Sequence, residues 1–210
     1  MGEQDVREQS KAEEIRVFLR HLLKDVRAFE QMLEEERFET GVRRIGAEQE
    51  LFLVDHLWRP APIATEVLEV VDDPHFTTEL ARFNLEFNLD PHVFGGSCLR
   101  DMEWQLGELL GKAREAAQKC GGDVVLTGIL PTLKKTDLEL INMTPNPRYY
   151  ALNEAMNRLR GGAYEFYLQG LDELHLHHDS ILVEAANTSF QVHFQVSPDE
   201  FARLYNAAQA

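Results

Sequence analysis

Four side chains that could bind a metal ion recur within three apolar segments. The segment RIGAEQELFLV carries Glu48 and Glu50, the segment FNLEFNL carries Glu86, and the segment SFQVHFQV carries His193. Successive side chains of a β-strand point to opposite faces of the sheet. Each segment is therefore predicted to be a strand with these polar groups on one face and mainly apolar groups on the other. If the three strands share a sheet, the four side chains converge on one polar, concave face.

The chemistry that such a face favours is divalent-metal binding. Carboxylates held close together repel one another unless a cation neutralises them. Glutamate oxygens suit Mg²⁺ or Mn²⁺, and one imidazole nitrogen is compatible with either ion. Because Mg²⁺ commonly lies between a few carboxylates and substrate phosphates, nucleotide-dependent phosphoryl transfer is a natural hypothesis. The alternative for any single strand is that its polar face only meets water.

Hydrophobic periodicity predicts the elements that must position these strands. Steps of three and four between apolar residues predict helices at 15–33, 99–117 and 148–160, and a further helix starts at 197–200; strands are predicted at 43–54, 83–89, 124–129 and 189–196. The predicted fold class is α+β, with an antiparallel sheet whose apolar face packs on helices. Leu51, Leu85 and Val192 are expected on that buried face, opposite the carboxylates.

The chain divides into two parts. Residues 1–40 hold an amphipathic helix whose apolar stripe runs from Ile15 to Leu33 and whose charges form a solvated face. This stripe is expected to pack on the rest of the domain or to form a dimer contact, so a homo-oligomer is one expectation. Residues 41–210 hold the sheet and the remaining helices.

Composition excludes several classes of protein. The 210 residues include 36 acidic and 21 basic side chains, a formal net charge of −15, which disfavours binding to nucleic acid or to an anionic membrane through a positive field. No apolar run approaches the roughly 20 residues that a membrane span needs. Cys98 and Cys120 form neither a disulfide framework nor a zinc-finger spacing. The cytoplasm is the expected compartment.

Four motifs together carry a family resemblance. The segments RIGAEQELFLVD, TTELARFNLEF, NPRYYALNEAMNRLRGG and TSFQVHFQV, in this order, resemble successive N-terminal motifs of the glutamate–cysteine ligase and carboxylate–amine ligase family. The order of the motifs makes the resemblance specific, and it implies part of a glutamine-synthetase-like catalytic fold. The second motif resembles a helix-then-strand piece with two acidic residues seven apart, here Glu79 and Glu86.

The resemblance implies an activity and a set of roles. In that family ATP phosphorylates a substrate γ-carboxylate, and an amine then displaces phosphate from the acyl phosphate to form an amide; glutamate with cysteine, or with another amine, would be the substrates. The roles implied for this sequence are metal ligation with Mg²⁺ or Mn²⁺ by Glu48, Glu50, Glu79, Glu86 and His193, catalysis by Glu86 and Arg148, and ATP binding by Arg148, Arg158 and Arg160. Guanidinium groups suit phosphate and carboxylate because they can donate two parallel hydrogen bonds.

The sequence departs from the family pattern at two places. Catalytic domains of the family are longer, and their later half supplies another metal carboxylate and further arginines, so residues 41–210 resemble an incomplete, N-terminal part. We therefore expect negligible ligase activity from this chain alone. The second departure is Gln49, which lies between the two glutamates on the predicted core face and requires a polar partner there.

Other readings of the residues remain open. A non-catalytic metal- or nucleotide-binding module and a metal-dependent hydrolase could each use the same carboxylate face. The run HLHHD places His175 and His177 on one strand face, which suits an adventitious zinc or nickel site or simply a polar strand edge. Glu184 could face the site or pair with a nearby arginine.

Overall fold

One long central strand, β1 (Arg44–Val54), organises the sheet in the computed structural model, which describes residues 12–210. It pairs on one side with β3 (Asn84–Asn88) and β4 (His92–Val93), and on the other with β5 (Asp123–Val125) and β8 (Phe190–Phe194); β2 (Phe76–Thr78) extends the sheet beyond β3. All of these pairings are antiparallel, as predicted.

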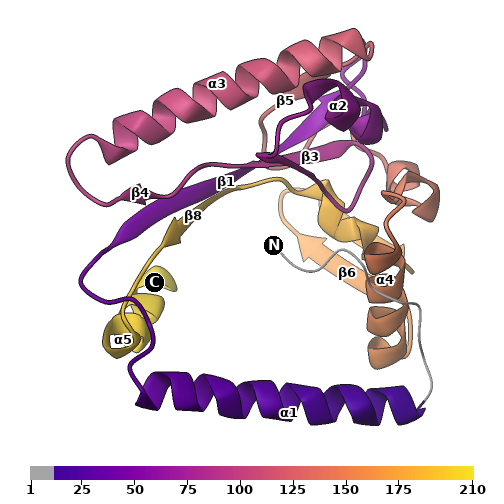
Figure 1. Ribbon diagram of the computed structural model, residues 1–210. Helices are drawn as coiled ribbons and strands as arrows, with labels where there is room; N and C mark the ends of the chain where they lie inside the picture. Colours follow the sequence, from indigo (N-terminus) through magenta and orange to yellow (C-terminus); the bar gives the residue numbers. More distant parts are fainter. Residues whose placement is uncertain (1–11) are drawn as a thin grey trace.

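The apolar face of the sheet packs beneath two helices, α2 (Ala64–Val71) and α3 (Cys98–Lys119) (Figure 1). Leu51 of β1 lies opposite Leu85 of β3, and both side chains are completely buried. Gln49 lies on the same face, and its amide donates hydrogen bonds to the backbone carbonyls of Glu50 (2.6 Å) and Ser189 (3.3 Å). The predicted helix-covered face and the polar partner of Gln49 are thus both confirmed.

The opposite face of the sheet is polar over only half its length. Beyond Glu50, the next two residues of β1 on this face are Phe52 and Val54, and both are completely buried in a second core. Three short 3₁₀ helices contribute to that core or flank it: η1 (Lys135–Leu138), η2 (Leu140–Asn142) and η3 (Ile181–Ala186). The carboxylates therefore lie where an apolar core ends.

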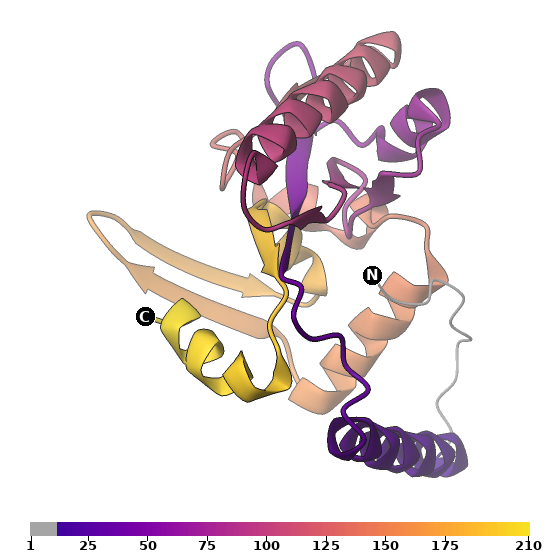
Figure 2. The ribbon, with the colours of Figure 1, turned by 60° about the vertical axis from the view of Figure 1, so that its left-hand side comes forward.

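A helix and a hairpin form the wall beside the polar half of the sheet. The helix α4 (Pro147–Arg160) begins at an N-cap, where the side chain of Asn146 accepts a hydrogen bond from the backbone amide of Arg148. The hairpin of β6 (Tyr164–Gln169) and β7 (Glu173–His178) follows and extends away from the sheet (Figure 2). Periodicity predicted α4 but did not identify β6.

Three sequence predictions are wrong in detail. The strand expected at 124–129 stops at Val125, and Ile129 is exposed. The motif TTELARFNLEF is not a helix followed by a strand, because β2 and β3 form a hairpin there. Val192 is on the same face of the sheet as Leu51, because it pairs with Ala47, but it is not buried: it is 54% exposed, since neither α2 nor α3 packs against β8.

Two amphipathic helices lie away from the sheet. The helix α1 (Ala12–Glu34) runs across the side opposite α3, and residues 35–43, which form no helix or strand, connect it to β1 (Figure 1). The helix α5 (Pro198–Ala208) begins beside that connection, where Glu200 forms an ion pair with Arg43 at 2.6 Å. The sequence predicted a first part that comprises residues 1–40, and residues 1–11 of that part lie outside the residues that the structure describes. No helix within residues 12–210 is both long and apolar enough to cross a membrane.

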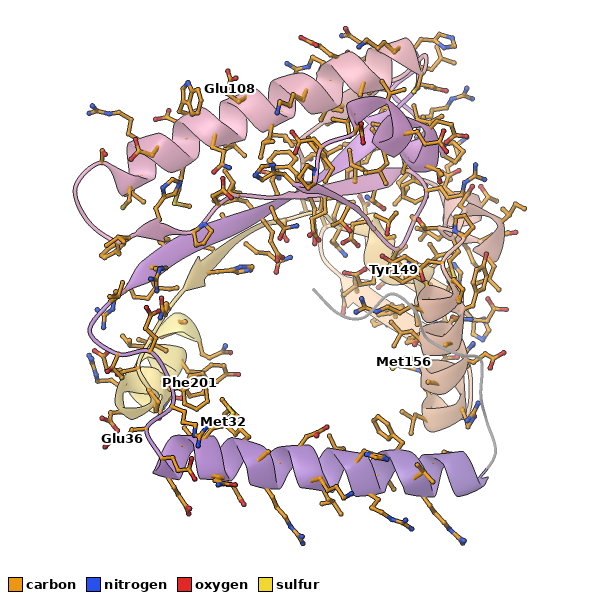
Figure 3. All side chains as sticks on the ribbon, viewed as in Figure 1. Met32, Glu36, Glu108, Tyr149, Met156 and Phe201 are labelled. Carbon is orange, nitrogen blue, oxygen red and sulfur yellow. The ribbon has the colours of Figure 1, made fainter. Side chains whose placement is uncertain are left out.

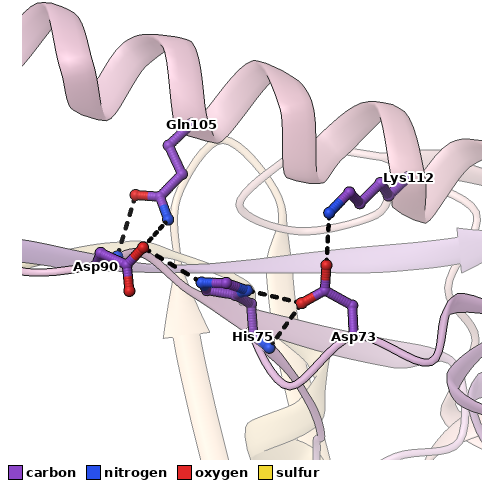
Figure 4. Close-up of polar contacts among 5 residues, drawn as sticks. All are labelled: Asp73, His75, Asp90, Gln105 and Lys112. Carbon is purple, nitrogen blue, oxygen red and sulfur yellow. Dashed lines mark hydrogen bonds and ion pairs between the residues drawn. The ribbon is translucent and has the colours of Figure 1, made fainter.

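A polar network joins α3 to the edge of the sheet (Figure 4). The imidazole of His75 contacts Asp73 through Nδ1 at 2.7 Å and Asp90 through Nε2 at 3.4 Å. From α3, Lys112 donates to Asp73 at 2.6 Å, and the Gln105 amide exchanges hydrogen bonds with Asp90. Hydrogen bonding to Asp73 is the main cause that raises the pKa of His75 above its usual value.

This network predicts a pH dependence of stability. Because the folded-state pKa of His75 is raised, the stabilisation from its protonated form is fully present below about pH 6.5 and is lost as the pH rises through the folded-state pKa. We expect the free energy of unfolding to fall over this interval in the wild type and to change less in His75→Gln. Urea titrations at several pH values measure it. The exposed His56→Gln serves as the control, and an equal pH slope in His75→Gln and the wild type would contradict the prediction.

Candidate metal and nucleotide site

Three glutamates meet on the polar half of the sheet. Glu50, Glu79 and Glu86 each offer a carboxylate oxygen, and these oxygens all lie within 4.8 Å of one another. All three side chains are partly buried. Within residues 12–210 this is the single group of three or more such side chains with that geometry. The predicted meeting of Glu50 and Glu86 on one face is confirmed.

The backbone fixes this convergence. Glu50 and Glu86 are direct cross-strand partners in the β1–β3 pairing, a register that brings their side chains together on the same face. Glu79 reaches them from the turn between β2 and β3. That turn is tethered by Thr144, whose hydroxyl donates to the Glu79 carbonyl at 2.6 Å, and by Tyr149, whose hydroxyl donates to the Thr78 carbonyl at 2.9 Å.

The electrostatics of the cluster favour a cation. Burial raises the pKa of Glu79 to about 8, and hydrogen bonding to Glu86 and the negative charges of Glu86 and Glu50 contribute in the same direction. Loss of solvation also raises the pKa of Glu184, with a contribution from the charge of Glu50. A proton on Glu79 thus relieves repulsion that a bound divalent ion would relieve more fully.

Neighbouring polar groups hold two of the carboxylates in place. Glu50 accepts hydrogen bonds from the backbone amide and hydroxyl of Ser189 and, at 3.0 Å, from the amide of Gln191. Glu86 accepts a hydrogen bond from the amide of Asn88 at 2.7 Å. Such contacts orient ligand carboxylates and restrict their rotation. Gln191 and Asn88 lie two residues from predicted site residues on the same strand face, which is the signal that identifies them in the sequence.

Glu48 and His193 lie at the margin of the cluster. The Nε2 atom of His193 lies 3.5 Å from a Glu48 carboxylate oxygen, and the side chains are 53% and 15% exposed, respectively. Register explains the contact, because Gly46 pairs with His193 and Glu48 with Gln191 across β1 and β8. The two residues form a neighbouring pair rather than members of the three-glutamate group, and their predicted role as metal ligands stays a prediction.

A cavity of about 950 Å³ opens beside the carboxylates. Glu48, Glu79 and Glu86 line its polar side, and Arg148 is its one arginine among the described residues. Leu152 and Met156 follow Arg148 at four-residue steps along α4 and continue the lining as an apolar wall, with Tyr164 and Phe166 from β6. Tyr149 and Met156 lie on the same side of α4 (Figure 3). The volume suits a ligand of nucleotide or amino-acid size.

The structure separates Arg148 from the other two predicted arginines. Arg158 and Arg160 are exposed and do not line the cavity. Arg160 instead donates to the carbonyl of Ala163 at 3.2 Å, and its guanidinium lies 4.2 Å from the ring centroid of Tyr164. A helix has 3.6 residues per turn, so a step of ten residues from Arg148 places Arg158 on another face. The pattern of arginines alone did not reveal this.

Two other sequence candidates do not form sites. His175 and His177 belong to β7, opposite Tyr167 and Glu165, and within the described residues they join no group of three metal-ligand atoms. The cysteines are both free. Sequence reasoning did not single out Tyr149 as a site residue, although it follows Arg148 directly and lines the cavity.

Comparison with known protein families gave a match. Residues 44–208 match Glutamate-cysteine ligase family 2 (GCS2). The chain belongs to this family. Comparisons with curated proteins and with solved structures each gave no match. The matched residues include β1, β3, β8, α4 and the turn between β2 and β3, and hence every glutamate of the cluster, and they begin after α1. Membership in glutamate-cysteine ligase family 2 implies a ligase of the carboxylate–amine type.

The carboxylate cluster fits the divalent metal that a ligase of this family would need. Three carboxylate groups supply oxygen ligands of the type that Mg²⁺ and Mn²⁺ prefer, and the cavity beside them leaves room for phosphates and water as further ligands. Glu50, Glu79 and Glu86 are the residues that would hold the ion. Their mutual repulsion in the metal-free protein is the structural sign of such a site.

The raised pKa of Glu79 predicts that metal affinity depends on pH. Below about pH 8 an incoming ion must displace the proton on Glu79, so affinity should rise between pH 6 and pH 8 and level off above. Calorimetric Mn²⁺ titrations across this interval, repeated in buffers with different ionisation enthalpies, measure the affinity and the released proton. An affinity that is constant over the interval would contradict the assignment of Glu79.

Proposed function

We propose that the protein takes part in ATP-dependent formation of an amide bond between glutamate and an amine, with cysteine as the first candidate for the amine. The observation that carries this proposal is the cluster of three glutamates beside a cavity that also holds Arg148, in a chain of glutamate-cysteine ligase family 2. Mg²⁺ or Mn²⁺ is the proposed metal and ATP the proposed nucleotide.

The reaction proceeds in two steps. The γ-carboxylate oxygen of glutamate attacks the γ-phosphorus of ATP, so that ADP leaves and an acyl phosphate forms. The amine nitrogen then attacks the acyl carbon, the bond to the phosphate oxygen breaks, and the nitrogen loses a proton. Activation is needed because a carboxylate is a poor electrophile until its oxygen becomes part of a leaving group.

The chain's own residues bind and orient the reactants. Glu50, Glu79 and Glu86 hold the divalent ion, which when bound neutralises charge on the phosphates. Arg148 donates hydrogen bonds to a phosphate or to the substrate carboxylate. The apolar wall of Leu152 and Met156 limits water near the acyl phosphate, which water would otherwise hydrolyse.

Phosphate release from ATP tests this function. The assay uses the 210-residue chain and the full product of its gene, with Mg²⁺, glutamate and a panel of amines that includes cysteine. Release that requires both glutamate and cysteine supports a glutamate–cysteine ligase, and release with a different amine supports a related ligase. Metal binding without turnover in either protein would support a non-catalytic module. Metal-dependent cleavage without ATP would support a hydrolase.

A matched variant assigns the activity to this site. In a protein that shows turnover, Arg148→Gln removes the guanidinium but keeps a polar, uncharged side chain, and we expect it to lower kcat/KM strongly. Arg158→Gln is the matched control, because Arg158 belongs to the same helix but lies outside the cavity. Equal activity of the two variants would contradict the role of Arg148.

A further inference from the structure

The helix α1 carries a continuous apolar seam that the described residues leave exposed. Six residues at alternating steps of four and three form the seam, and their exposed fractions lie between 39% and 53%: Ile15, Leu19, Leu22, Val26, Phe29 and Leu33. This 4–3 spacing is the heptad pattern of a helix that packs against another helix. Large contiguous apolar patches are uncommon on the surface of stable monomers and often mark an interaction surface.

Charge is distributed unevenly along the same helix. Between Ile15 and Lys24 the charged side chains other than histidine are all basic: Arg16, Arg20 and Lys24. From Asp25 to Glu36 all but Arg27 are acidic: Asp25, Glu30, Glu34, Glu35 and Glu36. A parallel pair of α1 helices would set the acidic residues of 25–36 beside their own copies, whereas an antiparallel pair sets the basic residues of 15–24 beside the acidic residues of 25–36. Glu13 and Glu14, in the first turn of α1, lie outside this basic stretch.

We propose that α1 pairs with α1 of a second copy of this chain as an antiparallel two-helix coiled coil. In this register Ile15 faces Leu33 of the second copy, Leu19 faces Phe29, and Leu22 faces Val26. The two-fold symmetry repeats each contact, which gives six apolar layers. A helix of 23 residues is about 35 Å long, so these layers span most of it.

The flanking positions agree with this register. Each Leu23 lies beside the Leu23 of the second copy, and Phe18 lies beside Met32, so the seam is broadened by apolar contacts. Glu30 lies beside the basic half of the second helix. Among the positions that flank the seam, this register creates a single like-charged contact, between Asp25 and the Asp25 of the second copy. Residues 35–43, which contain no helix or strand, connect the paired helix to each sheet.

The site proposed for ligase chemistry is independent of this contact. The family match begins at residue 44, after α1, and none of the cavity-lining residues belongs to α1. Failure of the pairing would therefore leave the proposed function untouched, and loss of ligase activity would leave the pairing untouched.

Sedimentation and light scattering of the whole chain test the pairing. The wild type should be a dimer that dissociates on dilution. Leu22→Glu with Val26→Glu places charges in the two central layers and should raise the dissociation constant by at least about a hundredfold, since buried unpaired charges are costly. Both residues are exposed in the single chain, so the fold itself should be kept, which circular dichroism checks. Leu171→Glu, at the exposed tip of the β6–β7 hairpin, is the control and should remain dimeric.

Orientation is tested by two further variants. Chains with Leu19→Cys mixed with chains with Phe29→Cys should form a disulfide-linked heterodimer under mild oxidation, whereas Leu19→Cys alone should not cross-link through that residue. Glu30→Arg should weaken the antiparallel pair, whereas in a parallel pair it would relieve repulsion from Asp25 and strengthen association. A wild-type monomer at every concentration, or a dimer unaffected by the Leu22 and Val26 substitutions, would overturn the proposal.

Discussion

Glu86→Gln is expected to have opposite effects on stability with and without metal. Without metal, the substitution removes the charge of one of three crowded carboxyl groups while keeping the shape of the side chain, so the variant should melt at an equal or higher temperature than the wild type. With Mn²⁺ at a hundredfold excess over the dissociation constant, the wild type should gain roughly 2.7 kcal/mol. The variant should gain much less, because it has lost a ligand.

Thermal melting in chelator and across a Mn²⁺ titration measures both effects. Glu108→Gln is the matched control, since Glu108 is exposed and points outward from α3 (Figure 3). This control should show the full metal-induced shift. If Glu86→Gln kept the full shift as well, Glu86 would not be a metal ligand.

Leu85→Ala should produce the other large effect. Leu85 is completely buried beneath α2 and α3, on the face opposite the carboxylates. Truncation removes transfer free energy and leaves a cavity, so we expect a loss of about 2–5 kcal/mol in the free energy of unfolding. Because the cluster side chains are on the other face, the stabilisation by Mn²⁺ should be retained.

Urea unfolding with and without Mn²⁺ separates these contributions. Leu171→Ala, at the exposed hairpin tip, should change the free energy of unfolding by less than about 0.5 kcal/mol. A loss below about 1 kcal/mol for Leu85→Ala would show that the covered face is not a packed core.

Period-two alternation predicted the centre of the site correctly. Within each strand, alternation places Glu50 and Glu86 on the face opposite the buried leucines. The register of the β1–β3 pairing then sets the two glutamates directly opposite each other. The four family motifs supplied Glu79, which no strand pattern identifies because it lies in a turn. Its place near Glu86 depends on a hairpin that the sequence pattern did not predict.

The rest of the site depends on tertiary packing that local patterns do not encode. Phe52 continues the strand face that Glu48 and Glu50 begin, yet it is buried in a cluster that contains Phe83 and residues as far along the chain as Ala185. Val192 has the same alternation as Leu85, but no helix covers it. Arg148 and Arg158 belong to one helix and differ only in which side of the helix each occupies. In each case the sequence pattern predicted the character of the residue, but it did not predict which other parts of the chain surround that residue.

Direct Mn²⁺ titration followed by electron paramagnetic resonance tests the central claim that Glu50, Glu79 and Glu86 form a metal site. The free Mn²⁺ signal reports binding without requiring turnover. We predict saturable binding by the wild type and by Glu108→Gln, and a dissociation constant at least about tenfold higher for Glu86→Gln, as is typical when a ligand or its support is lost. Equal binding by all three proteins, or no saturable binding by the wild type, would contradict the claim.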